Sequence, residues 1–267
     1  MELMIVKDGD ALAFPSDAKT ANTRIRKRNR LTVVGVIGEL LITGGVLVLL
    51  FLGWQLWLND VIVGNQQNSN ALVLSESWSK GYPTTPAPAL RPDPGLPPAS
   101  TAPTHAVQFG SLIIPRFGAD YRRPIAEGVG TEDVLRVGVG HYPGTQMPGE
   151  VGNVALAAHR TTWGAPFADI ANLKVGDSIY IETAAGWFRY VFRSLQYVPP
   201  TGVEVLAPVP ASESASPTDR ILTMTSCNPK FSAAERFIAY SVYDTWYPRA
   251  GGPPPQISSQ FGAKGVG

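Results

Sequence analysis

The chain has 267 residues, with 22 Lys and Arg against 21 Asp and Glu, and this near balance gives no electrostatic case for a nucleic-acid partner. Composition changes strongly along the sequence, so the folded part is expected to be shorter than the whole chain. The basic residues are instead placed locally, in the stretch "RIRKRNR" at residues 24–30.

An almost uninterrupted apolar stretch, residues 31–58, follows this basic cluster. About 20 apolar residues cross a bilayer as a helix, so the stretch predicts one transmembrane helix. No Lys or Arg occurs in residues 58–79, and the positive-inside rule then predicts a cytoplasmic tail at residues 1–30 and an extracellular domain, held by a single pass in the cell membrane. A cleavable signal peptide is the alternative, but its apolar region is usually only ~7–15 residues long and ends at a small-residue site.

Residues 59–106 are predicted to connect the span to a folded domain, first as a stalk and then as a proline-rich linker. The first part is polar with scattered apolar residues and fits either a continued helix or a disordered segment. Eight prolines between residues 83 and 103 exclude helix and sheet and favour extended polyproline II. At ~3.1 Å per residue this linker is a semi-rigid spacer of up to roughly 60 Å.

The residue pattern changes at about residue 107, where short runs rich in Val, Ile, Tyr and Phe alternate with Gly and Pro turns. This pattern predicts an all-β domain over residues 107–248, built as a sandwich or a barrel. The expected strands are "GSLIIP", "NVALAA", "DSIYIE", "WFRYVFRSLQYV", "RILTMT" and "RFIAYSVYD". One short helix is expected at "PFADIANL", and the Gly- and Pro-rich residues 249–267 are expected to form a disordered tail.

Cys227 is the only cysteine of the chain. In an exported domain an unpaired cysteine is a reactive thiol, an intermolecular partner or a buried inert side chain. The strand "RILTMT" alternates, so Leu222 and Met224 share one face while Thr225 and Cys227 share the other, more polar face. The thiol is therefore expected on the polar face at the end of a strand.

Arg236 begins the next expected strand, which returns antiparallel to the first and brings its guanidinium near Cys227. A permanent cation there favours the thiolate, which is the nucleophilic form, and can hold an oxyanion. Zinc binding by the cysteine and the histidines is disfavoured, because no C-x₂-C or H-x₃-H pair is present, and no metal or cofactor is predicted.

A thiolate that acylates also needs a group that protonates the leaving amine, and three histidines are available. His105 ends the proline-rich linker and is expected to be solvated, and His141 lies in a turn region where a structural role is commoner. His159 directly follows the apolar strand "NVALAA" and precedes a polar loop, which is where catalytic groups tend to lie.

The order of these features resembles the sortase family of cysteine transpeptidases. The resemblance is carried by "AAHRTTWGAPFADIANLKVGD" and "TMTSCNPKFSAAERF", and upstream by "GSLIIPRFG", "IAEGVG" and "GVGHYPGTQMPGEVGN". It extends over about residues 108–245 and is most similar to the class E sortases of actinobacteria. It implies a closed sortase-type β-barrel with one or two short helices and a catalytic triad of His159, Cys227 and Arg236.

Three positions depart from the family pattern. Met224 replaces the leucine of T-L-x-T-C, Ser226 replaces the threonine before the cysteine, and Ala158 stands where a glycine often precedes the histidine. Serine keeps the hydroxyl and alanine adds one methyl group, so we expect activity to survive. The segment "DPG" at residues 93–95 lacks the aromatic residue of a pilin-polymerase lid, which favours an anchoring enzyme.

The resemblance implies cleavage of a C-terminal sorting signal, of Leu-Ala-x-Thr-Gly or Leu-Pro-x-Thr-Gly type, between Thr and Gly. The expected partners are secreted proteins that carry such a signal, an amino group of a peptidoglycan precursor of the lipid II type, and the membrane. The alternatives are a pilin-polymerising sortase, a secreted cysteine peptidase, and a membrane-tethered β-domain that only binds. An L,D-transpeptidase is disfavoured because its S-H-G-C-x-R pattern is absent.

Overall fold

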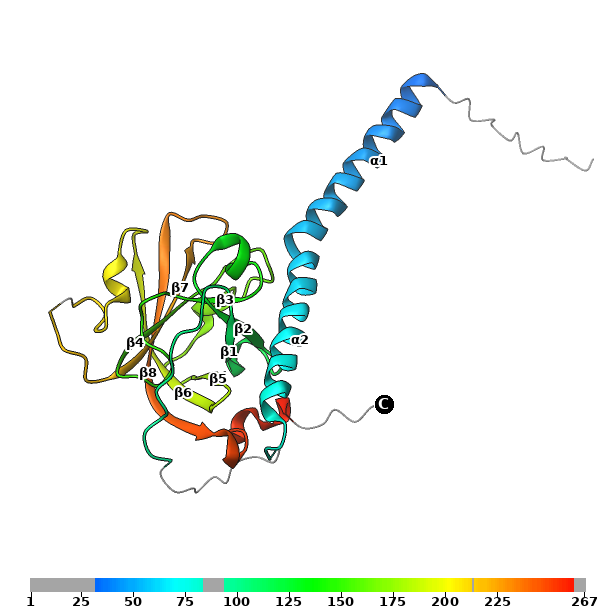
Figure 1. The fold of residues 1–267 in the computed structure, drawn as a ribbon. Helices are drawn as coiled ribbons and strands as arrows, with labels where there is room; N and C mark the ends of the chain where they lie inside the picture. Colours follow the sequence, from blue (N-terminus) through cyan, green and yellow to red (C-terminus); the bar gives the residue numbers. More distant parts are fainter. Residues whose placement is uncertain (1–31, 84–93, 213, 262–267) are drawn as a thin grey trace, which may run out of the picture. The chain divides into compact units, whose positions relative to one another are not determined.

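The computed structural model describes residues 32–83, 94–212 and 214–261 (Figure 1). The chain divides into two compact units, Met1–Leu47 and Val48–Gly267. The predicted cytoplasmic tail at residues 1–30 and linker residues 84–93 lie outside the described residues.

Helix α1 (Val33–Gly53) has 21 residues and is long and apolar enough to cross a membrane, with none of its residues buried. At 1.5 Å per residue such a helix is about 30 Å long, which matches the hydrocarbon core of a bilayer. A single π-helical turn, Trp54–Leu58, leads directly into helix α2 (Asn59–Ser79).

Eight strands of the described residues close into a barrel in the order β1-β2-β3-β4-β7-β8-β6-β5 (Figure 1). The strands are β1 (Gln108–Ile113), β2 (Arg122–Glu127), β3 (Val139–His141), β4 (Gly152–Ala157), β5 (Ser178–Thr183), β6 (Gly186–Val198), β7 (Arg220–Asn228) and β8 (Glu235–Pro248). The pairs β2–β3 and β4–β7 are parallel, and the other neighbours are antiparallel. The predicted all-β barrel is therefore confirmed.

The barrel interior holds the main hydrophobic core, in which Leu156, Leu222 and Met224 are fully buried. The alternation in "RILTMT" predicted this side for Leu222 and Met224. All six expected strands form. The expected helix at residues 166–173 is only a 3₁₀ turn, Ile170–Asn172.

The sequence pattern did not predict strands β2 and β3. Strand β2 begins with two arginines and a proline, "RRP", a composition that argues against a strand because proline donates no ladder hydrogen bond. Its residues are nevertheless all buried, because β1 covers one edge of the strand and β3 the other while α2 packs against it.

Helix α2, over the predicted stalk, packs against strand β2 of the barrel. Its buried residues, Gly64, Gln67, Ala71 and Ser75, form one face at helical spacing. The linker that follows therefore connects two parts that are already in contact, and it does not space the barrel from the helix. Where the linker is described again it lies on β8, since Trp246 donates its indole N–H to the carbonyl oxygen of Gly95 (3.0 Å).

The prediction of a disordered tail at residues 249–267 is wrong for residues 249–261. Two 3₁₀ turns form there, Arg249–Gly251 and Pro255–Gln260, and Ile257 is buried. The side chains of Ile257 and Phe261 pack on the outer side of the barrel around Trp187, with the Phe261 and Trp187 ring centroids 5.2 Å apart. A composition rich in Gly and Pro concealed these few anchoring side chains.

Glu182 of β5 joins the barrel, helix α2 and this C-terminal segment. Its fully buried carboxylate accepts hydrogen bonds from Arg122 of β2 (2.8 Å), Arg249 of the C-terminal segment (3.0 Å) and the hydroxyl of Ser75 of α2 (2.6 Å). One carboxylate thus binds three segments that are far apart in the sequence.

Candidate active site

Cys227 lies near the end of β7 as a partly exposed free thiol. Its strand neighbours at even positions point into the core, so the thiol points to the outer face of the barrel. The polar face predicted for it is the face that carries Thr223 and Thr225.

Arg236 is the register partner of Cys227 across the antiparallel pair of β7 and β8. Directly opposed residues share one face, with Cβ atoms about 4.5–5.5 Å apart. The guanidinium Nη1 donates to the carbonyl oxygens of Ala233 (3.0 Å) and Glu235 (3.1 Å), whereas its Nε and Nη2 have no hydrogen-bond partner in the described part of the chain. Those N–H groups remain available to a substrate oxygen.

His159 reaches the same end of the barrel from the parallel strand β4. The register pairs Ala157 with Thr225, so His159 and Cys227 each stand two residues beyond the last pair, on the same face. The strands stay together past that pair, because the N–H of Ala158 donates to the carbonyl oxygen of Thr225 (3.2 Å). The sequence-predicted residues His159, Cys227 and Arg236 therefore come from three neighbouring strand ends.

Two of the departures from the family pattern have a visible role. Ser226 donates its hydroxyl to the carbonyl oxygen of Ala158 (2.8 Å), which joins the ends of β7 and β4 just before Cys227 and His159. The methyl group of Ala158 is part of the barrel core. Both replacements are accommodated without disturbing the two strand ends.

The His159 imidazole is partly buried, and its Nε2 has no hydrogen-bond partner among the described residues. Burial lowers the pKa of His159, and the carboxylate of Asp60, on helix α2, opposes part of that shift. This buried ring nitrogen is therefore not committed to a hydrogen bond with the described residues, and an imidazole can carry or release a proton near neutral pH.

Arg160 was missed by the sequence reasoning. Its Nη1 donates to the carbonyl oxygen of Cys227 (3.4 Å) and to the side-chain oxygen of Asn228, and its guanidinium lies over the Phe237 ring, 5.0 Å from the centroid. Arg160 thus fixes the loop after His159 to the end of β7. Its only signal in the sequence is its position next to the histidine.

The other two histidines lie elsewhere. His141 is fully buried, with Nδ1 2.6 Å from the Glu127 carboxylate and Nε2 3.0 Å from the carbonyl oxygen of Gln146. His105 is exposed and pairs with Asp133 at 2.6 Å. Among the residues that the structure describes, no group of three His, Cys, Asp or Glu side chains is arranged to hold a metal ion.

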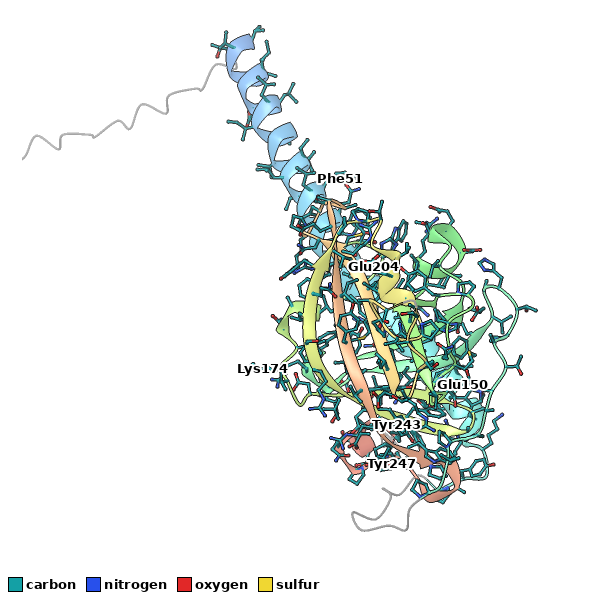
Figure 2. The ribbon with its side chains drawn as sticks, turned by 90° about the vertical axis from the view of Figure 1, so that its left-hand side faces the viewer. Phe51, Glu150, Lys174, Glu204, Tyr243 and Tyr247 are labelled. Atoms are coloured by element: carbon teal, nitrogen blue, oxygen red, sulfur yellow. The ribbon has the colours of Figure 1, made fainter. Side chains whose placement is uncertain are left out.

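The segment between β6 and β7 covers part of the outer face next to the site. Asn153 donates its side-chain amide to the carbonyl oxygens of Val205 and Ala207 (both 3.0 Å) and accepts a hydrogen bond from Thr223 (2.7 Å). Figure 2 shows Glu204 of this segment at the end of the barrel away from Tyr247. Val205 is buried there against Ile238 of β8, and the partly exposed side chains of Leu206 and Tyr240 pack against this pair.

Comparison with known proteins agrees with this geometry. The sortase domain family model matches residues 112–243. Sortase SrtE1 of Streptomyces coelicolor is 36% identical over 244 residues, which cover 88% of this chain and 64% of that protein. The chain belongs to the sortase family. It spans 64% of the length of SrtE1, so this sortase corresponds to only part of that relative.

Solved sortase structures share the fold. The SrtA sortase from Actinomyces oris is 35% identical with a TM-score of 0.59, and the match covers 64% of this sortase and 98% of that chain. Sortase E1 from Streptomyces coelicolor, solved with a tripeptide in its active site, is 37% identical with a TM-score of 0.53, over 59% of this sortase and 99% of that chain.

Proposed function

We propose that this sortase cleaves a C-terminal sorting signal between Thr and Gly and joins the new carboxyl end to an amino group of a cell-wall precursor. The observation that carries the proposal is the register, which brings Cys227 between His159 on one neighbouring strand end and Arg236 on the other. Members of the family are cysteine transpeptidases, and these three side chains supply a nucleophile, an acid and a cation.

In the first half-reaction the Cys227 thiolate attacks the carbonyl carbon of the threonine. The developing oxyanion is stabilised by Arg236, through the guanidinium N–H groups that are not bound to Ala233 and Glu235. As the carbon–nitrogen bond breaks, the His159 imidazolium protonates the departing glycine amine. The product is a thioester of the threonine carboxyl with Cys227.

In the second half-reaction an amine attacks the thioester carbon. His159, now neutral, takes a proton from the attacking nitrogen, the carbon–sulfur bond breaks, and Cys227 leaves as the thiolate. An amide replaces an amide, so the exchange needs no external energy source. With water as the acceptor the same site would give a free acid, which is the cysteine-peptidase alternative.

The sorting signal is proposed to be of the Leu-Ala-x-Thr-Gly type, with Leu-Pro-x-Thr-Gly as the second candidate. The similarity to class E sortases supports the first motif. The tripeptide in the active site of Streptomyces coelicolor sortase E1 supports a peptide as the occupant of this site, and the partly exposed Leu206 and Tyr240 are apolar side chains that such a peptide could contact.

Helix α1 is proposed to cross the cell membrane, with the basic tail in the cytoplasm and the barrel outside. The excess of Arg and Lys before the helix and their absence from residues 58–79 support this orientation. Protease added to intact cells should remove the barrel and spare an N-terminal tag. Digestion of the tag with protection of the barrel would contradict the orientation.

The test of the function is a peptide-joining reaction followed by mass spectrometry. The protein is incubated with each signal peptide and an amine, and the expected product is the peptide ending at Thr joined to that amine. Product formation only with water would favour the peptidase. Resistance of Cys227 to iodoacetamide at neutral pH, together with no cleavage, would favour a domain that only binds.

A further inference from the structure

The loop that follows His159 has a strained backbone. Thr162, Trp163 and Ala165 have φ angles of 67°, 50° and 40°, and Gly164 between them has φ 76°. The left-handed region is unfavourable for residues with a side chain, most of all for a β-branched threonine, at a cost of about 1–3 kcal/mol each. Such a run persists only where surrounding groups hold it in place.

Helix α2 supplies those groups. The two carboxylate oxygens of Asp60 accept hydrogen bonds from the N–H groups of Thr162 and Gly164, both at 3.1 Å. Gln67 lies about two helical turns after Asp60 and is almost fully buried. It donates its side-chain amide to the carbonyl oxygen of Trp163 (2.8 Å). Three consecutive residues of the loop are thus bound by two side chains of α2.

The helix and the loop also meet backbone to backbone. A Cβ atom on Gly164 would lie 2.9 Å from the amide nitrogen of Gly64 in α2, which is closer than real Cβ contacts come. On another side, the Arg136 guanidinium lies 3.9 Å from the centroid of the Trp163 ring. The loop is therefore held between α2 and the segment before β3.

The helix itself is fixed to the barrel over its length. Asn68 accepts a hydrogen bond from the backbone N–H of Arg122 in β2 (3.0 Å), and Ser75 donates to the buried carboxylate of Glu182 (2.6 Å). Asp60 and Gln67 thus extend from a helix that is hydrogen-bonded to β2 and β5 at two further points.

We propose that helix α2 is a positioning element of the active site, in which Asp60 and Gln67 hold the strained loop and thereby the orientation of His159. The proposal rests on the proposed role of His159 in proton transfer. His159 and Arg160 stand at the start of this loop, so release of Thr162–Ala165 loosens both the imidazole and the contact of Arg160 with the end of β7. The segment directly after the proposed membrane anchor thus sets the geometry of the acid.

The charge of Asp60 also affects the pKa of His159. Asp60 on α2 is the charged group that acts on the pKa of His159, while Arg160 follows His159 in the loop and Cys227 and Arg236 lie on the neighbouring strand ends of β7 and β8. Asp60 raises the pKa of His159 against the effect of burial. Its removal lowers that pKa further, which a purely mechanical support would not do.

The test compares Asp60→Asn with Glu76→Gln in the full chain, purified in detergent. Glu76 is the other carboxylate of α2 and is exposed. Asp60→Asn keeps the side-chain size but loses the charge and one of two acceptors. Misplacement of a catalytic group by about 1 Å lowers rates up to about 100-fold, so we expect kcat to fall about 10- to 100-fold with little change in KM for the peptide. The limb of the pH profile that follows His159 should move to lower pH, and Glu76→Gln should match the parent protein.

Hydrogen exchange gives a second readout that requires no activity. Asp60→Asn should expose the amides of Thr162 and Gly164 to faster exchange, and Gln67→Ala, which leaves the charge of Asp60 in place, should lower kcat without moving the pH profile. If Asp60→Asn fails to fold, Gln67→Ala with unchanged kcat and unchanged exchange in the loop would overturn the proposal.

His159→Ala separates this proposal from the function on which it rests. An inactive His159→Ala protein together with an Asp60→Asn protein of normal kcat and normal pH profile would overturn the positioning role and leave the function in place. An active His159→Ala protein would overturn the function instead. A fall in activity of Asp60→Asn that only follows a loss of folded protein, with the pH profile unmoved, would also count against positioning.

Discussion

Replacement of Glu182 by Gln should destabilise the Val48–Gly267 unit strongly. The buried carboxylate pairs with the guanidinium groups of Arg122 and Arg249, which are themselves almost fully buried. Gln keeps the shape and one acceptor oxygen but leaves two cations without a counter-charge. Breaking a buried ion pair by removing one partner costs about 3–5 kcal/mol. With about 2–4 °C of Tm per kcal/mol for a domain of this size, Tm should fall by about 6–20 °C.

The assay is thermal unfolding of the full chain in detergent, followed by near-ultraviolet circular dichroism. Asp244→Asn is the matched control, because it removes the carboxylate of an exposed pair with Arg189 (2.7 Å). Exposed pairs contribute about 0–1 kcal/mol, so the control should shift Tm by no more than a few degrees. Equal shifts for Glu182→Gln and Asp244→Asn would refute the role given to the buried network.

Three further predictions concern the site and its surroundings. His141→Ala should lower Tm while the folded fraction stays active, because the substitution removes the imidazole that lies 2.6 Å from the buried Glu127 carboxylate. Loss of activity in fully folded protein would contradict this structural role. Because the pKa of His159 is lower in the folded protein, the folded protein binds fewer protons than the unfolded chain just below pH 6.5. The free energy of unfolding measured with urea should therefore fall as the pH drops through that range. The His159→Gln substitution should reduce this pH dependence. Arg236→Lys should lower kcat at least about 10-fold although the charge is kept, because an ammonium lacks the planar N–H groups that address a carbonyl oxygen; kcat equal to that of the parent would argue against an oxyanion role.

Six of the eight strands, and the face of β7 that carries Cys227, could be predicted from local patterns. Alternation in "RILTMT" placed Leu222 and Met224 in the core and Cys227 on the outer face, and the return of the chain after residue 228 placed Arg236 beside it. The partner of Cys227 on the other side could not be derived in this way. The parallel pairing of β4 with β7 joins residues about 70 positions apart, so the sequence favoured His159 through its place at a strand end and through the family resemblance, and not through its register with Cys227.

The docking of α2 was not predictable from hydrophobicity. Its buried face consists of small or polar residues, Gly64, Gln67, Ala71 and Ser75, so the sequence alone predicts a polar stalk here. The binding comes instead from hydrogen bonds to strained backbone and to a buried carboxylate, which become visible only when the partners are in place. The order of the C-terminal segment could not be predicted for the same reason: it depends on a polar contact, from Arg249 to the Glu182 carboxylate in β5, and not on an apolar pattern.

Cys227 is proposed to form the thioester, and intact mass spectrometry of the acyl-enzyme detects that thioester on the protein. The full chain is mixed with a Leu-Ala-x-Thr-Gly peptide without an amine and quenched in acid. We expect a mass increase equal to the peptide acyl group up to Thr, located on Cys227 by peptide mapping, and its disappearance with formation of the joined product when an amine is added. An adduct on another residue, or a Cys227→Ala protein that still joins peptide to amine, would contradict the account.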